Sequence, residues 1–177
     1  MPLFVALLVP DERLLPIAKL FEKYGFRPIR VSELHLTLLF IGDYSGAHAH
    51  RIASALAREK LSMPDTLYCK GLTLIPPGKN THVAIMLEDD VRLIDARKRF
   101  IEILRRLGYS VRDRYLNDYK PHITIARRRR GENLPPQQLM VKASTLLPKS
   151  LHPTRLALLE TSPKGYRVLA ELEAEWG

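Results

Sequence analysis

Hydrophobic and polar positions divide the chain into short apolar runs and longer amphipathic stretches that follow one another in a repeated order. The apolar run 4–9 predicts a buried strand. Apolar residues at helical spacing over 11–24 predict a helix that Asp11 caps and Gly25 ends. A further strand is expected over 34–40, where apolar and polar residues alternate.

The same order returns in the second half of the chain. An apolar run predicts a strand over 82–87, and a helix follows over 90–107 that Gly108 ends. Arg97 falls within the apolar stripe of this helix, so its guanidinium is expected to reach past its neighbours to solvent. A strand over 121–126 completes the set after a loop.

The two halves also match residue by residue. Residues 5–8 (Val-Ala-Leu-Leu) correspond to 83–86 (Val-Ala-Ile-Met), and 35–38 (His-Leu-Thr-Leu) correspond to 122–125 (His-Ile-Thr-Ile). Apolar strands resemble one another by chance, but the same element order ending in the same polar pair indicates an internal duplication. We therefore expect two related lobes.

The rest of the chain connects and extends these units. No low-complexity linker divides the sequence, so residues 1–177 are expected to form a single bilobal domain. The remaining predicted elements are a surface helix over 45–60, a strand over 66–75 with a turn at 76–78, a short helix that begins at 135–136 within the segment 132–144, and a hairpin of strands 155–161 and 166–172.

Composition and charge narrow the class of protein. With 46% hydrophobic and 27% charged residues, the 177-residue chain is too apolar for a disordered protein. Its 28 Lys and Arg against 19 Asp and Glu give a net charge of +9, which favours polyanionic partners and simple solubility about equally. Cys69 is the single cysteine, and no apolar run approaches the ~20 residues of a membrane-spanning helix. We expect a monomer of the cytoplasm that does not bind membranes.

The candidate chemistry lies on the two predicted strands that share the His-x-Thr pattern. Alternate side chains of a strand share a face, so His35 and Thr37 point one way, as do His122 and Thr124. If the two faces meet, one imidazole can accept a proton from water while the other donates a proton to a leaving oxygen on phosphorus. The threonine hydroxyls can hold the non-bridging oxygens. Such a site needs no metal ion.

Simpler interpretations of these residues are weaker. A single His-x-Thr tripeptide is common and more often marks an ordinary histidine, but two copies in duplicated strands reverse those odds. Two histidines with threonines give too few good ligands for zinc, and no carboxylate lies beside either pair. A Ser-His-Asp nucleophile has no local support.

Residues 34–42 (Leu-His-Leu-Thr-Leu-Leu-Phe-Ile-Gly) resemble the first signature of the two-histidine phosphoesterase superfamily, and 121–127 (Pro-His-Ile-Thr-Ile-Ala-Arg) resemble the second. Within that superfamily the chain resembles the RNA 2′,3′-cyclic phosphodiesterases, also named 2′-5′ RNA ligases (LigT-like). The similarity covers nearly the whole length and includes the tail 158–166.

This resemblance implies an α+β, bilobal fold of duplicated strand–helix units, with antiparallel sheets lining a central cleft. It implies hydrolysis of RNA 2′,3′-cyclic phosphate ends to 2′-phosphate ends without a cofactor. It also implies 2′-5′ joining of RNA ends, with tRNA halves as candidate partners. By the resemblance, His35 is the proton donor, His122 the proton acceptor, and Thr37 and Thr124 hold the phosphate; the symmetry of the sequence alone cannot order the two histidines.

Arg127 matches the arginine that follows the family's second motif. Unbroken alternation would turn it away from His122, whereas a strand that ends near residue 126 would let it turn back toward the phosphate. Arg128, Arg129 and Arg130 complete a run that fits a solvated loop and a grip on the RNA backbone equally well.

Three aromatic residues are candidates for stacking on a base of the RNA. Tyr115 and Tyr119 fall in a loop, where stacking is open to them. Phe40 shares the parity of Leu36 and Leu38, so regular alternation predicts that it packs in the core. The histidines without a threonine two residues later are treated as ordinary surface or structural residues: His48, His50, His82 and His152.

Two other functions fit the same residues. An RNA-binding module with little turnover would explain the net charge and the arginine run equally well. A cyclic phosphodiesterase that acts on small nucleotides would use the same histidines. RNA binding that survives loss of both histidines would favour the first, and a preference for small nucleotides over RNA ends would favour the second.

Overall fold

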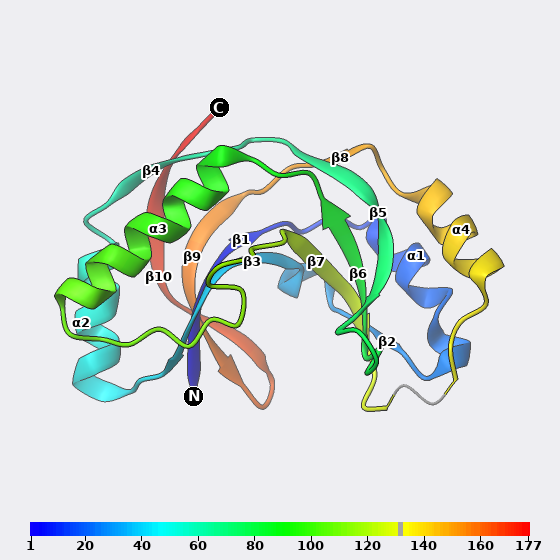
Figure 1. The fold of residues 1–177 in the computed structure, drawn as a ribbon, viewed down its shortest axis with the longest axis horizontal. Helices are drawn as coiled ribbons and strands as arrows, with labels where there is room; N and C mark the ends of the chain where they lie inside the picture. The colour runs from blue at the N-terminus through cyan, green and yellow to red at the C-terminus, as the bar shows by residue number, and fades with distance from the viewer. Residues whose placement is uncertain (131–132) are drawn as a thin grey trace.

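The computed structural model describes residues 1–130 and 133–177, which form a curved ten-stranded sheet with four α-helices (Figure 1). The α+β class is confirmed. The strands are Pro2–Leu8 (β1), Arg27–Pro28 (β2), His35–Asp43 (β3), Lys60–Met63 (β4), Leu67–Ile75 (β5), His82–Leu87 (β6), His122–Arg127 (β7), Ser150–Leu151 (β8), Arg155–Ser162 (β9) and Gly165–Trp176 (β10). The α-helices are Leu14–Lys19 (α1), Gly46–Leu56 (α2), Val91–Arg106 (α3) and Gln137–Leu146 (α4).

The two strands that carry the histidine–threonine pairs meet at the centre of the sheet. The strand order is β4-β10-β9-β1-β3-β7-β6-β5-β8, with β2 added alongside β7. All these pairs are antiparallel except β4 with β10. Because β3 pairs with β7 at Leu36 and Ile123, the two halves of the duplication join along this line.

One helix from each half of the sequence packs against strands of the other half. The helix α1 follows β1 in the sequence but packs against β2 and β7, while α3 follows β6 but packs against β3 and β4. Figure 1 shows α2 and α3 together on one side of the molecule and α1 and α4 on the other. Each side therefore takes a helix from the other half of the sequence, which a simple reading of two successive strand–helix units does not predict.

A large apolar cluster runs through both sides of the molecule. Leu36 of β3 and Ile123 of β7 are fully buried in it, and so are Phe21 beside α1 and Phe100 of α3. Burial of the apolar stripe of each helix supplies the main favourable free energy of the fold. One apolar cluster therefore includes residues from both sides of the molecule.

The helix predicted over 11–24 is wrong as a continuous element. The α-helix ends at Lys19, and a 3-10 turn over Glu22–Tyr24 follows before Gly25 closes the segment with φ 84°. Between them, the Phe21 amide donates to a carbonyl three residues earlier, which tightens the chain and brings the Phe21 ring into the core.

The surface helix predicted over 45–60 also ends early, at Leu56. The chain then forms β4, which pairs in parallel with residues 173–176 at the end of β10. The partner strand lies more than a hundred residues away, so local periodicity cannot reveal it.

The other predicted elements are found within a few residues of their expected bounds. Asp90 caps α3 by accepting a hydrogen bond from the Arg92 amide. The first residue of the segment predicted over 132–144 lies outside the described residues, and the helix within that segment is α4. Among the described residues, no helix has the length and apolar character needed to cross a membrane.

Candidate active site

The two histidine–threonine pairs form a group of four side chains on one face of the central strands. Leu36 lies opposite Ile123 in the antiparallel pair, so one step outward places His35 beside Thr124 and Thr37 beside His122. Leu36 and Ile123 are buried behind the sheet, while the four polar side chains remain partly exposed in front of it. The structure thus brings together the four residues that the sequence placed on two separate strands.

Both strands carry a β-bulge three residues after the histidine. In β3, Thr37 pairs with Ala6 and Leu39 with Val5, so Leu38 is the extra residue. In β7, the register with β6 passes from Thr124 to Ala126 and leaves out Ile125. The duplication therefore extends to an irregularity of the backbone, and bulges often re-aim side chains next to active sites.

The bulge turns the residue five places after each histidine onto the histidine face. Phe40 is 36% exposed, not buried with Leu36 and Leu38, and the prediction that it packs in the core is wrong. The regular alternation that supported that prediction is broken at Leu38. For the same reason Arg127 lies within strand β7 and still emerges on the exposed side.

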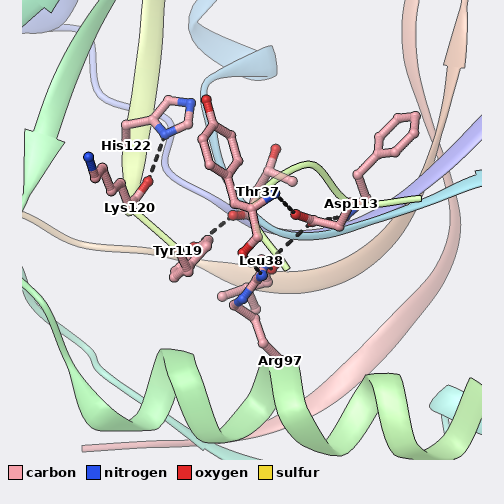
Figure 2. A network of polar contacts seen from close by, with 9 residues as sticks. Thr37, Leu38, Arg97, Asp113, Tyr119, Lys120 and His122 are labelled. Atoms are coloured by element: carbon pink, nitrogen blue, oxygen red, sulfur yellow. Dashed lines mark hydrogen bonds and ion pairs between the residues drawn. The ribbon is translucent and has the colours of Figure 1, made fainter. Parts of the chain in front are cut away.

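Each imidazole is held by the same type of hydrogen bond. Nδ1 of His35 lies 2.7 Å from the Glu33 carbonyl oxygen. Nδ1 of His122 lies 2.8 Å from the Lys120 carbonyl oxygen, the bond drawn in Figure 2. A carbonyl only accepts, so Nδ1 of each ring must carry the proton. Nε2 is then the atom that is left to accept or donate a proton in the site.

The surroundings of His35 are aromatic. Its ring centroid lies 4.8 Å from that of Tyr166 and 5.3 Å from that of Phe4. Burial, together with the positive charges of His122 and Arg127, lowers the pKa of His35 from 6.5 to about 4, although the Glu33 carbonyl opposes the shift. His35 is therefore uncharged at neutral pH in the free protein.

The turn between β9 and β10 presses against the residues that precede His35. Gly165 adopts φ 124°, and a Cβ atom at this position would lie 2.3 Å from Oε1 of Glu33. Only glycine allows this approach without displacing the Glu33 side chain. The contact places Tyr166, the next residue, against the His35 ring.

A buried ion pair supports the bulge of β3. Arg97 is 4% exposed; its guanidinium donates to the Leu38 carbonyl and lies 3.3 Å from the Asp113 carboxylate. Asp113 in turn accepts the amide of Phe40 at 2.7 Å. Figure 2 shows Arg97 rising from α3 toward Leu38 and Asp113. The expectation that Arg97 reaches solvent is wrong, because the loop after α3 supplies a carboxylate that holds it inside.

The two candidate tyrosines occupy different positions in this network. The Tyr119 hydroxyl donates to the Thr37 carbonyl at 2.7 Å, and the Arg97 guanidinium lies 4.1 Å from the centroid of the Tyr119 ring (Figure 2). These contacts give Tyr119 a structural role and leave little of its ring for stacking on a base. Burial raises the pKa of Tyr119. Tyr115 meets His122 edge-on, with ring centroids 6.1 Å apart.

Two pockets flank the histidines. One, of about 410 Å³, lies at the His122 end; it is lined by Thr37, Phe40, Ile75, Pro76, His82, Arg112, Asp113, Arg114, Tyr115, Tyr119, His122 and Thr124. The other, of about 840 Å³, is lined by Gly25, Arg27, Pro28, Ile29, Arg30, Glu33, Arg127, Arg128, Arg129, Pro163, Lys164 and Gly165. It lies at the His35 end, because Glu33 bonds His35 and Gly165 precedes the tyrosine that packs on His35.

Sequence reasoning missed His82, which lines the pocket at the His122 end. The available signal was its place in the duplication: His82 pairs with Arg127 in the second half as Phe4 pairs with Phe40 in the first. Burial and the positive charge of Arg127 lower the pKa of His82. Arg112 and Arg114 of the same pocket were also missed, since an irregular loop gives no periodicity to interpret.

The arginine run divides by role. The Arg128 guanidinium donates to the carbonyls of Tyr24 and Asn133 at 2.8 and 2.5 Å and lies 4.2 Å from the Phe26 ring centroid, so it braces the fold. Arg127 and Arg129 are exposed along the larger pocket. Arg130 is exposed and is not among the residues that line either pocket. Within 1–130 and 133–177, no three His, Cys, Asp or Glu side chains cluster as metal ligands.

Comparison with known proteins identifies the family of this chain. The model of the 2′-5′ RNA ligase superfamily matches residues 9–165, a span that includes both histidine strands. The chain belongs to the 2′-5′ RNA ligase superfamily. The chain is 33% identical over 135 residues to the RNA 2′,3′-cyclic phosphodiesterase of Archaeoglobus fulgidus. This match covers 73% of the chain and 74% of that protein.

Solved structures show the same architecture for this superfamily member. TT0787 of Thermus thermophilus matches with a TM-score of 0.66 and 26% identity over 97% of both chains. LigT of E. coli, in a complex with 3′-AMP, matches with a TM-score of 0.66 and 22% identity, again over 97% of both chains. The LigT-like fold expected from the two signatures is therefore confirmed.

Proposed function

We propose that the protein hydrolyses RNA 2′,3′-cyclic phosphate ends to 2′-phosphate ends by paired-histidine acid–base catalysis that needs no metal ion. The observation that carries this proposal is the pair of imidazoles on adjoining strands, each with Nδ1 tied to a carbonyl and Nε2 left for proton transfer. The name of the Archaeoglobus fulgidus relative supports the substrate class.

The reaction is an in-line displacement at phosphorus. Water attacks from the side of His122, whose Nε2 accepts the water proton. The bond from phosphorus to O3′ breaks on the opposite side, where Nε2–H of His35 donates a proton to O3′. The hydroxyls of Thr37 and Thr124 donate to the non-bridging oxygens, and Arg127 adds positive charge where negative charge develops. The product carries the phosphate on O2′.

His35 must gain a proton before it can donate one. Its pKa of about 4 in the free protein keeps the ring neutral near pH 7. A phosphodiester anion placed between the two histidines favours the charged ring and raises that pKa. The resemblance of residues 34–42 to the first family signature is the reason for assigning His35 as the donor, and in this proposal it becomes protonated as the anionic substrate binds.

The same groups can join two RNA ends when a different nucleophile attacks the cyclic phosphate. A 5′-hydroxyl of a second RNA end would replace water, His122 would accept its proton, and a 2′-5′ linkage would form. Paired RNA ends such as tRNA halves fit this joining reaction. The single cysteine fits a reducing compartment such as the cytoplasm, and we propose that the protein acts there as a monomer.

The deciding experiment uses purified protein, EDTA and an oligoribonucleotide with a 2′,3′-cyclic phosphate end. We expect opening to a 2′-phosphate end at a rate that EDTA does not change. The product is distinguished from a 3′-phosphate end by chromatography against both standards. Absence of ring opening, under conditions where a known cyclic phosphodiesterase works, contradicts the activity, and a requirement for added divalent cation contradicts metal independence.

A further inference from the structure

The larger pocket at the His35 end is a basic groove, and of its cationic residues the proposed reaction uses only Arg127. Six of the residues along it are cationic and Glu33 is its one carboxylate. Arg128 is committed to backbone carbonyls, and Arg30 lies 3.9 Å from the Glu33 carboxylate. The other four cations make no ion pair with any described residue: Arg27, Arg127, Arg129 and Lys164.

Two of these cations are held against each other by the fold. Arg27 of β2 lies directly opposite Arg127 of β7 in the antiparallel ladder. Directly opposed residues of such a pair share a face, and like charges there destabilise a sheet. On the other side of β7, Arg127 faces His82 in the same way. The fold thus holds two positive side chains, Arg27 and Arg127, against each other, an arrangement that a bound polyanion relieves.

The groove lies at the end of the site where the leaving group must sit. Its wall includes Glu33, which bonds His35, and Gly165, whose neighbour Tyr166 packs on the His35 ring. A proton donor must lie next to the oxygen that it protonates. That oxygen is O3′ of the terminal ribose, and the rest of the RNA strand is attached to the same ribose.

We propose that this groove binds the phosphates on the 5′ side of the terminal nucleotide, so that the enzyme selects RNA strands over free cyclic nucleotides. The inference rests on the proposed function, because it takes its direction from the donor role of His35. Arg27, Arg129 and Lys164 bind backbone phosphates and take no part in the chemical step. Each such contact with a single strand contributes a slope of about −0.7 to the dependence of log affinity on log salt.

The pocket at the His122 end is the alternative place where the RNA strand could leave the site. It carries the exposed residues Arg112 and Arg114 beside its aromatic residues. In the proposed reaction this end admits water, or the second RNA end during ligation. An RNA strand that leaves the site here would depend on Arg112 and Arg114 and not on the groove.

The test compares two substrates, a ten-nucleotide RNA with a 2′,3′-cyclic phosphate end and a nucleoside 2′,3′-cyclic phosphate that has no 5′ phosphate. The groove variant is Arg129→Glu with Lys164→Glu, which leaves Arg127 and the residue opposite it unchanged. The competing-path variant is Arg112→Glu with Arg114→Glu. The charge control is Arg58→Glu with Lys142→Glu, two exposed residues that line neither pocket. Each double substitution changes the net charge of +9 by −4, to +5.

We expect the groove variant to lose at least tenfold in kcat/KM on the ten-nucleotide RNA and less than twofold on the mononucleotide. The magnitude of its salt slope on RNA should fall by at least 1, since two contacts are removed. The charge control should lose less than threefold on either substrate. Equal losses on both substrates, or a selective loss in the competing-path variant alone, overturn the groove proposal.

A binding measurement separates this proposal from the proposed function. A fluorescent ten-nucleotide RNA with a 3′-phosphate end is titrated with each protein, and thermal unfolding verifies that every variant folds. If the wild-type chain opens neither cyclic phosphate, the proposed function fails. In that case a tenfold weaker affinity of the groove variant relative to the charge control still supports the groove, and equal affinities overturn it.

Discussion

The two halves of the site share a backbone and differ in what surrounds it. Each half has a His-x-Thr strand, a bulge three residues after the histidine, and a neighbouring strand in the same register. In the first half, the pair across the neighbouring strands is Phe4 with Phe40. In the second half, the same pair is His82 with Arg127. One half is therefore aromatic where the other is cationic.

The bulges are also supported differently. In the first half the Leu38 carbonyl accepts a hydrogen bond from the buried Arg97 side chain. In the second half the Ile125 carbonyl accepts one from the Ile29 backbone amide at 2.8 Å. One bulge depends on an ion pair from a distant helix, and the other depends on the backbone just after β2.

These differences show how two copies of one motif come to have different surroundings. The hydrogen bonds to the imidazoles are the same, so tautomer and orientation do not distinguish the histidines. Aromatic packing and nearby cations lower the pKa of His35, and the substrate anion opposes that shift. The two imidazoles therefore differ in their neighbours and not in the motif that carries them.

The largest expected effect is loss of either imidazole. His35→Ala and His122→Ala should each lower the rate of ring opening by about 10²–10⁴-fold, because each removes one proton transfer. The double variant should be little worse than the single ones, since the two groups act in one transition state. Initial rates on a cyclic-phosphate oligoribonucleotide measure this. His50→Ala, on the exposed face of α2, is the control; a single variant with normal turnover would contradict the paired mechanism.

The second largest expected effect is loss of the buried ion pair that supports the bulge of β3. Arg97→Met leaves the Asp113 carboxylate buried and unpaired, so the free energy of unfolding in urea should fall by about 3–5 kcal/mol. Arg155→Met removes the exposed ion pair with Glu171 and should cost less than about 1 kcal/mol. Equal stability of the two variants would show that the buried pair does not hold the first half together.

A third prediction uses the pH dependence of stability to test the lowered pKa of His35. His35 has a pKa of 6.5 when unfolded and about 4 when folded, so the unfolded chain binds more protons between these values. Stability should therefore be complete above pH 6.5 and decline as the pH falls toward 4, by at most about 3 kcal/mol. Urea unfolding at pH 4–7 measures the decline. His35→Gln should flatten it, and an unchanged slope in that variant would contradict the assignment.

The smallest expected effect concerns Phe40. Because the bulge turns Phe40 out of the core, Phe40→Ala should lower the free energy of unfolding by about 1 kcal/mol or less. Phe100→Ala removes a ring that is 0% exposed and should cost about 3–5 kcal/mol. If Phe40→Ala lowered the free energy of unfolding as much as Phe100→Ala, Phe40 would be a core residue, as regular alternation predicts.

The sequence determined the elements whose signal is local. Alternation and helical spacing located β6, α3 and the β9–β10 hairpin, and the repeated His-x-Thr pattern located both histidines and their hydroxyl partners. Local steric and hydrogen-bonding preferences are enough for these features, because each depends on residues within a few positions of one another.

Only the tertiary structure decided which neighbours each local feature meets. The exchange of α1 and α3, the pairing of β4 with β10, and the contact of Arg97 with Asp113 join segments that carry no mark of one another in the sequence. The bulges at Leu38 and Ile125 reverse the facing of Phe40 and settle that of Arg127, because one extra residue shifts every later side chain to the other side of a strand.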